Sequence, residues 1–155
     1  MRHWLLQSTL LLSACNTEKI AQLEKQNKEL AAKLESASKS GILDLQEKCA
    51  KQARELFKSD GWEKEKMASF TNHYNQRLNK CFVQVESTHD GTWTSTFVAD
   101  AFEGKGYGQY YWESVRGKKY WEVPPFRCKV MSLGGEETDC HSDEEFKTAM
   151  KQYME

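Results

Sequence analysis

The residues best suited to acid–base chemistry in this chain are its histidines. His73 lies in the polar stretch Thr71–Asn75, His89 precedes an Asp-Gly turn signal, and His141 follows a cysteine. A hydrolase would need such a histidine held by a carboxylate beside a serine or cysteine nucleophile. No nucleophile elbow, paired spacing or phosphate-binding glycine loop selects such a set. We therefore expect no catalytic residue, metal or cofactor, and keep as the alternative function a small hydrolase that uses His73 or His141 with a nearby carboxylate.

The amino terminus has the pattern of an export signal. Met1–His3 gives a positive start, and residues 4–12 form a mostly apolar run. The following tetrapeptide, Leu12-Ser13-Ala14-Cys15, resembles the lipobox of bacterial lipoproteins. In that family the chain is cut before the cysteine, which carries a diacylglycerol and an amide-linked acyl chain such as palmitate. The resemblance implies a signal peptide over residues 1–14 and lipidation of Cys15. The competing interpretation is a buried or chance cysteine near the terminus.

Residues 15–40 read as a helical tether. The composition after Cys15 is rich in Glu, Lys, Gln, Ala and Leu, and contains no Gly or Pro before Gly41. Core-type residues alternate three and four apart, with a lone asparagine at the first core position, which favours a parallel dimer. These are Ile20, Leu23, Asn27, Leu30, Leu34 and Ala37. We expect a homodimer through a short coiled coil, and the alternative is a monomeric charged helix that acts as a spacer.

The layout of a lipidated cysteine followed closely by heptads resembles the start of the murein lipoprotein. That resemblance ends with the tether, because this chain continues and ends in Gln152–Glu155 without a terminal lysine. Asn16, which follows the lipidated cysteine in place of the aspartate that retains enterobacterial lipoproteins, implies the outer rather than the inner membrane. Ser36–Gly41 is small and polar, and we predict a hinge there.

Residues 41–155 are predicted to form an α+β domain with an antiparallel sheet of about five strands flanked by helices. A helix over 42–58 carries Leu45, Cys49 and Ala53 at helical spacing, and Ser142 with Glu145 forms a capping box for a final helix. Turn signals separate the strand-like stretches. These stretches are residues 69–75, 80–87, 93–102, 107–115, 120–123, 126–133 and 136–140. The stretch Tyr74–Phe82 is similar to short uncharacterised bacterial proteins, and that similarity implies no activity.

Four further cysteines, an even number in an exported domain, predict two disulfides. Cys128 and Cys140 flank an expected hairpin, so they should pair locally, which leaves Cys49 with Cys81. A zinc site is the competing interpretation, but no two of these cysteines have the close spacing of a structural zinc ligand pair.

Aromatic residues crowd into neighbouring predicted strands. Because side chains alternate along a strand, a sheet with one covered face cannot bury all of them, and some should form an exposed recognition face for protein, peptide or glycan. Ordinary cross-strand aromatic pairing is the competing interpretation. The predicted face consists of Tyr107, Tyr110, Tyr111, Trp112, Tyr120 and Trp121.

Composition sets the remaining limits. The net charge is −1, so there is no electrostatic footprint for nucleic acid. Aromatic residues make up 12% of the chain, which can support a core, and no apolar run is long enough to span a membrane. We therefore expect a non-enzymatic lipoprotein of the bacterial envelope that is anchored in the membrane and presents a small binding module to an envelope protein or glycan.

Overall fold

The computed structural model describes the backbone of residues 5–65 and 67–155, and the side chains of residues 17–65 and 67–155. The chain divides into two compact units between Leu43 and Asp44. Cys15 and the predicted signal peptide have no described side chains, so lipidation lies outside the described residues. Within the described residues, no helix combines the length and the apolar character needed to cross a bilayer.

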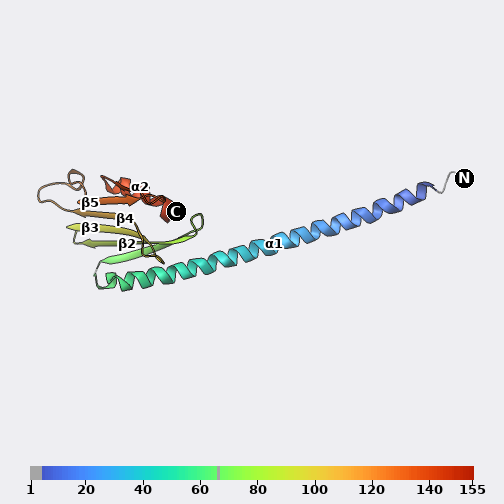
Figure 1. Cartoon of the computed structure of the whole chain (residues 1–155), viewed down its shortest axis with the longest axis horizontal. Helices are drawn as coiled ribbons and strands as arrows, with labels where there is room; N and C mark the ends of the chain where they lie inside the picture. Colours follow the sequence, from blue (N-terminus) through green and yellow to red (C-terminus); the bar gives the residue numbers. More distant parts are fainter. Residues whose placement is uncertain (1–4, 66) are drawn as a thin grey trace. The chain divides into compact units, whose positions relative to one another are not determined.

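A single helix, α1, runs from Leu5 to Ser59 (Figure 1). The predicted hinge is wrong, because Ser36–Gly41 is helical without a break. The serines cost a helix only tenths of a kcal/mol and Gly41 costs about 1 kcal/mol, while the flanking Lys, Leu and Ala residues favour the helix.

The second unit is α+β, as predicted, with six antiparallel strands rather than about five. Each strand pairs with its neighbour in the sequence, so the sheet is a meander in the order β1-β2-β3-β4-β5-β6. The hairpin between β2 and β3 turns at Asp90 and Gly91, which both have positive φ. The strands are β1 Ala68–Asn75, β2 Lys80–His89, β3 Trp93–Asp100, β4 Gly106–Glu113, β5 Arg127–Met131 and β6 Glu137–Asp139.

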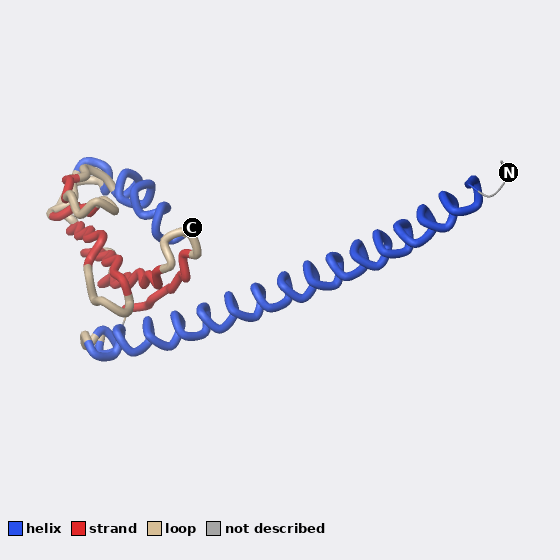
Figure 2. The backbone as a smooth tube through the Cα atoms, turned by 45° about the vertical axis from the view of Figure 1, so that its right-hand side comes forward, coloured by secondary structure: helices blue, strands red, loops and turns tan. Residues whose placement is uncertain are grey.

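Helices cover parts of both faces of this sheet. The last turns of α1 pack on one face, where Cys49 and Ala53 join Cys81, Val83 and Val85 of β2 in a buried cluster. The second helix, α2, spans Asp143–Met154 and packs on the other face (Figure 2). Side chains alternate along β2, so this strand contributes to both clusters.

Local sequence positions α2 as predicted. The hydroxyl of Ser142 accepts a hydrogen bond from the backbone N–H of Glu145, which caps the first turn. Phe146, Met150 and Tyr153 are buried against the sheet. The close approach of α2 to β4 requires a glycine at position 108, because a Cβ there would overlap the side chain of Met150.

The other end of α2 is held by an asparagine of β1. The buried amide of Asn75 donates hydrogen bonds to the backbone carbonyls of Gln152, Tyr153 and Glu155. Its side-chain oxygen accepts a bond from the N–H of Leu78. The amide thus satisfies carbonyls that a helix end leaves without partners.

Two short 3-10 helices lie in the connections between the longer elements. The first, η1, is Trp62–Lys64 and follows α1. The second, η2, is Tyr120–Glu122, where we predicted a strand, so that prediction is wrong. The strand is not formed because Glu122 and Lys119 close a local turn. The backbone N–H of Lys119 donates to the Glu122 carboxylate, and the backbone N–H of Glu122 donates to the Lys119 carbonyl.

Both predicted disulfides are confirmed. Cys49 of α1 is bonded to Cys81 of β2, and Cys128 of β5 is bonded to Cys140, which follows β6. The first joins the end of α1 to the sheet, and the second closes the last hairpin.

We predict that the two disulfides contribute unequally to stability. Their sequence separations are 32 and 12 residues. The loop-entropy term then favours Cys49–Cys81 by about 0.9 kcal/mol. Urea denaturation of the C49A/C81A and C128A/C140A double variants should show the larger loss in the first. A larger loss in the second would contradict the loop-entropy account.

Candidate functional site

A row of rings crosses the part of the sheet face that α1 leaves uncovered. The aromatic row, as we call it, consists of His89 at the end of β2, Trp93 of β3, Tyr111 of β4 and Phe126 just before β5. Successive ring centroids are 6.2, 6.1 and 5.9 Å apart. The first pair is stacked and the last is edge-on. Rings from four successive segments therefore form one continuous surface.

Strand register places these side chains together. His89 pairs with Trp93 across β2 and β3, and Ser95 pairs with Tyr111 across β3 and β4. Because directly opposite residues share a face, and alternate residues of one strand do too, these side chains lie on the same face. Phe126 is 81% exposed, and its ring contact with Tyr111 extends the row to β5.

A cavity of about 440 Å³ borders the row. Its wall includes Asp60, which precedes η1, Trp62 of η1, Phe97 of β3, and Gln109 with Tyr111 of β4. It therefore combines aromatic rings with a carboxylate and an amide. Half-buried rings with polar groups beside them suit recognition of an extended ligand.

A charged group completes this surface. Arg127 pairs with Tyr111 across β4 and β5, and its guanidinium donates a 3.0 Å hydrogen bond to the side-chain oxygen of Gln109. Both side chains are exposed. The surface can thus contribute stacking from the rings and charged hydrogen bonds from Arg127.

The predicted binding face does not exist as one surface. Tyr107, Tyr110 and Trp112 are 5, 3 and 7% exposed and belong to the core under α2. Tyr110 and Trp112 point to this side by alternation. Tyr107 joins them because the register shifts at Val98 and Ala99, a bulge that turns its side chain inward. The assumption that only one face of the sheet is covered was wrong.

The other three residues of the predicted face separate. Tyr111 lies in the aromatic row, while Tyr120 and Trp121 lie in η2 and line a different cavity of about 470 Å³. Tyr120 is held by a 3.1 Å hydroxyl–hydroxyl hydrogen bond to Tyr110, whose pKa is raised by burial and by this bond. Trp121 is 76% exposed, and the ammonium of Lys119 lies over its ring.

Sequence reasoning missed three members of the site. Trp93, Phe126 and Arg127 are not among the residues predicted to form the binding face. The signal that could have found Trp93 is the two-residue spacing of Trp93, Ser95 and Phe97 along β3, which places the three side chains on one face. Phe126 and Arg127 could be placed only with the register of β5 against β4.

The three histidines whose side chains are described do not meet at one site. His89 is in the aromatic row, His73 is half-buried in β1, and His141 borders the cavity beside η2. The backbone N–H of His141, not its ring, bonds the carboxylate of Glu145. Among the side chains of residues 17–65 and 67–155, no histidine is hydrogen-bonded to a carboxylate, and no metal-binding group of His, Cys, Asp or Glu is formed.

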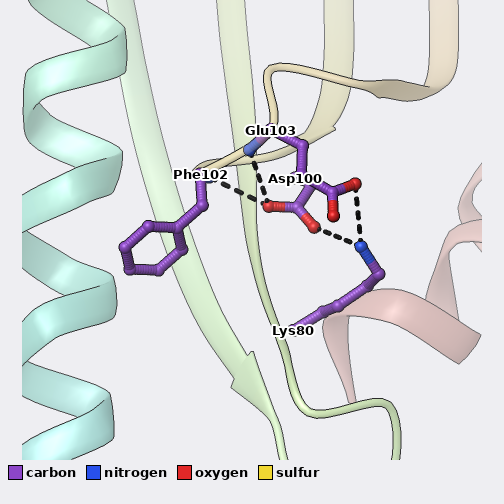
Figure 3. Close-up of polar contacts among 4 residues, drawn as sticks. All are labelled: Lys80, Asp100, Phe102 and Glu103. Atoms are coloured by element: carbon purple, nitrogen blue, oxygen red, sulfur yellow. Dashed lines mark hydrogen bonds and ion pairs between the residues drawn. The ribbon is translucent and has the colours of Figure 1, made fainter.

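The most buried carboxylate, that of Asp100, bonds only groups that stabilise the fold. Asp100, at the end of β3, accepts hydrogen bonds from the N–H groups of Phe102 and Glu103 at 2.9 and 3.2 Å (Figure 3). Its other oxygen bonds the ammonium of Lys80 at 2.7 Å, and Glu103 bonds the same ammonium at 3.0 Å. These two carboxylates raise the pKa of Lys80. The cluster fixes the turn between β3 and β4.

Comparison of the chain with protein-family models, curated proteins and solved structures gives no match.

We predict that Asp100→Ala lowers the free energy of unfolding by about 3 kcal/mol, because it leaves Lys80 without its buried partner and two N–H groups unbonded. Asp100→Asn should lose less, since an amide oxygen can still accept those N–H groups. Because the pKa of Lys80 is raised, its contribution is fully present below the ordinary lysine pKa and is lost only above it. Urea titrations at pH 6 and pH 9 should therefore give the same difference in unfolding free energy between the wild type and Asp100→Ala. Equal losses for the two variants would contradict this role of the turn.

Proposed function

We propose that this chain is a lipoprotein of the bacterial envelope, anchored by acyl chains on Cys15, whose second unit binds an envelope partner through the aromatic row. The observation that carries the binding part is the row itself, with Trp93, Tyr111 and Phe126 contributed by different segments. The partner is an envelope protein or glycan and not a nucleic acid. The proposal assigns the unit binding and not catalysis.

The anchor is supported by the lipobox resemblance at residues 12–15 and by the disulfides. Disulfides persist in oxidising compartments such as the bacterial periplasm, which agrees with export. One acyl chain anchors a protein only marginally, while several make release negligible. Asn16 after the lipidated cysteine favours the outer membrane.

Self-association through α1 belongs to the same proposal. In a single chain, the core-type leucines of the tether are exposed: Leu23 by 50%, Leu30 by 63% and Leu34 by 73%. A second copy could bury this stripe, and an asparagine at position 27 would favour parallel alignment in register. Lipid anchors would raise the local concentration and favour such a dimer.

Acylation is the first prediction. Metabolic labelling with a clickable palmitate analogue should tag the wild-type chain in a bacterial host, because the lipobox directs acylation to the Cys15 thiol and the new amino group. Cys15→Ser removes both and should abolish labelling. Equal labelling of the variant would overturn the anchor.

Dimerisation is the second prediction. Asn27→Leu should tighten self-association of a soluble Cys15→Ser chain and relax its specificity, because a buried amide costs stability while fixing the register. Sedimentation equilibrium measures the change, and Leu34→Asn is the control that should weaken association. A monomer at high concentration for both the soluble parent chain and the Asn27→Leu variant would leave α1 as a spacer.

Contact at the row is the third prediction. Photo-crosslinking in cells, with benzoylphenylalanine in place of Phe126, should give adducts, because this ring lies in the row and is exposed. Phe102, an exposed phenylalanine in the β3–β4 turn, is the matched control position. Adducts of equal yield at both positions, or at neither, would contradict binding through the row.

A further inference from the structure

We propose that the aromatic row binds an acidic polysaccharide, whose sugar rings stack on Trp93 and Tyr111 and contact the edge-on ring of Phe126, and whose carboxylates bond Arg127. This inference rests on the proposed function and specifies the chemistry of the ligand. Four features of the uncovered face support it. They are the unpaired charge of Arg127, the backbone pairing of the strands under the row, the spacing of the rings and the positions of the carboxylates.

Arg127, one of the cations of this face, has no anionic partner among the described side chains. Within that part of the chain its guanidinium bonds only the neutral amide of Gln109, at 3.0 Å. The next residue of β5 on the same face, Lys129, is different, since Glu137 and Asp139 bond it at 2.8 and 3.1 Å. A guanidinium presents a planar set of donors that matches a carboxylate, so Arg127 offers a free site for an anion. Charge complementarity therefore selects an acidic ligand.

The main chain beneath the two central rings of the row is already paired. Tyr111 lies in β4, which is bonded to β3 on one side and β5 on the other, and Trp93 lies in β3 between β2 and β4. A peptide that adds to a sheet needs an unpaired edge for its backbone, and the strands offer none at Trp93 and Tyr111. A ligand over these two rings must therefore be held by side chains. Sugars meet this condition because their C–H faces stack on rings and their hydroxyls bond side chains.

The rings suit an extended chain of sugar units. They follow one another at 6.1 and 5.9 Å from Trp93 through Tyr111 to Phe126, across the strands. Such a step is comparable with the advance of one unit in an extended β-linked polysaccharide. The Trp93 and Tyr111 planes are inclined by 31°, so both can face the same ligand, while the Phe126 plane is inclined by 83° to that of Tyr111 and contributes a ring edge.

Two carboxylates limit where the anionic groups can lie. Asp60 lies in the wall of the neighbouring cavity, and Glu113 pairs with Trp93 across β3 and β4. Neither forms an ion pair with Arg127. The acidic group is therefore expected at the Phe126 end of the row, and neutral parts of the ligand at the Trp93 end.

The test is titration of the full-length chain, in detergent micelles, with two matched probes. One is a hexamer of β-1,4-linked mannuronic acid, and the other is the corresponding hexamer of mannose. Calorimetry should detect binding of the acidic hexamer, about tenfold tighter than the neutral one, since a charged hydrogen bond contributes about 1.5 kcal/mol or more. Added salt should reduce the difference, because it screens exposed charges.

Variants locate the site. Arg127→Gln should remove the preference for the acidic hexamer, while Phe126→Ala should weaken the binding of both probes about tenfold, as expected for the loss of one aromatic contact. Phe102→Ala is the control, because it removes an exposed phenylalanine outside the row. Circular dichroism should show that each of these substitutions at an exposed position leaves the fold intact.

The outcomes separate this inference from the proposed function. Equal affinity for the two hexamers, or a preference that survives Arg127→Gln, overturns the acidic ligand. Absence of binding to both hexamers overturns a polysaccharide ligand. If photo-crosslinks at Phe126 then persist, the row binds a ligand of another class and the proposed function stands. If no crosslinks form either, both fail.

Discussion

The disulfide between Cys49 and Cys81 is the constraint on which the arrangement of the second unit depends. It joins the end of α1 to β2, at a site where Ala53 and a few partly buried side chains supply the remaining contacts. With α1 held there, β1 to β3 are covered on this face, while α2 covers the other. The uncovered part of the first face, over β3 to β5, is where the aromatic row lies.

Features encoded by a few adjacent residues could be predicted from the sequence. The Asp-Gly turn, the capped start of α2 and the last hairpin all follow from short-range chemistry, and the hairpin in turn predicts one disulfide. The bulge that turns Tyr107 inward could not be predicted, because it depends on how β3 and β4 pair. The helical turn at Tyr120 depends on the hydrogen bond from Lys119 to the Glu122 carboxylate, which could not be predicted from a composition typical of a strand.

The candidate site was less predictable than the fold. Alternation correctly indicates that some aromatic residues of β4 face away from the core, and Tyr111 does so. The neighbours of Tyr111 are determined by the register of β4 with β3 and β5. Trp93 and Arg127 come beside it only through the pairing of β3 and β5 with β4. The coverage of both faces is also non-local, since it depends on the packing of helices from opposite ends of the second unit.

The same disulfide has a mechanical consequence. Tension applied along α1 from its amino-terminal side reaches Cys49 and can pass through the sulfur–sulfur bond directly to Cys81 in the sheet. The intervening residues 50–80, which include the last turns of α1, η1 and β1, then lie in a covalently closed loop outside the shortest load path. Pulling on the tether would therefore load β2, an interior strand bonded on both sides, and would leave the edge strand β1 relaxed.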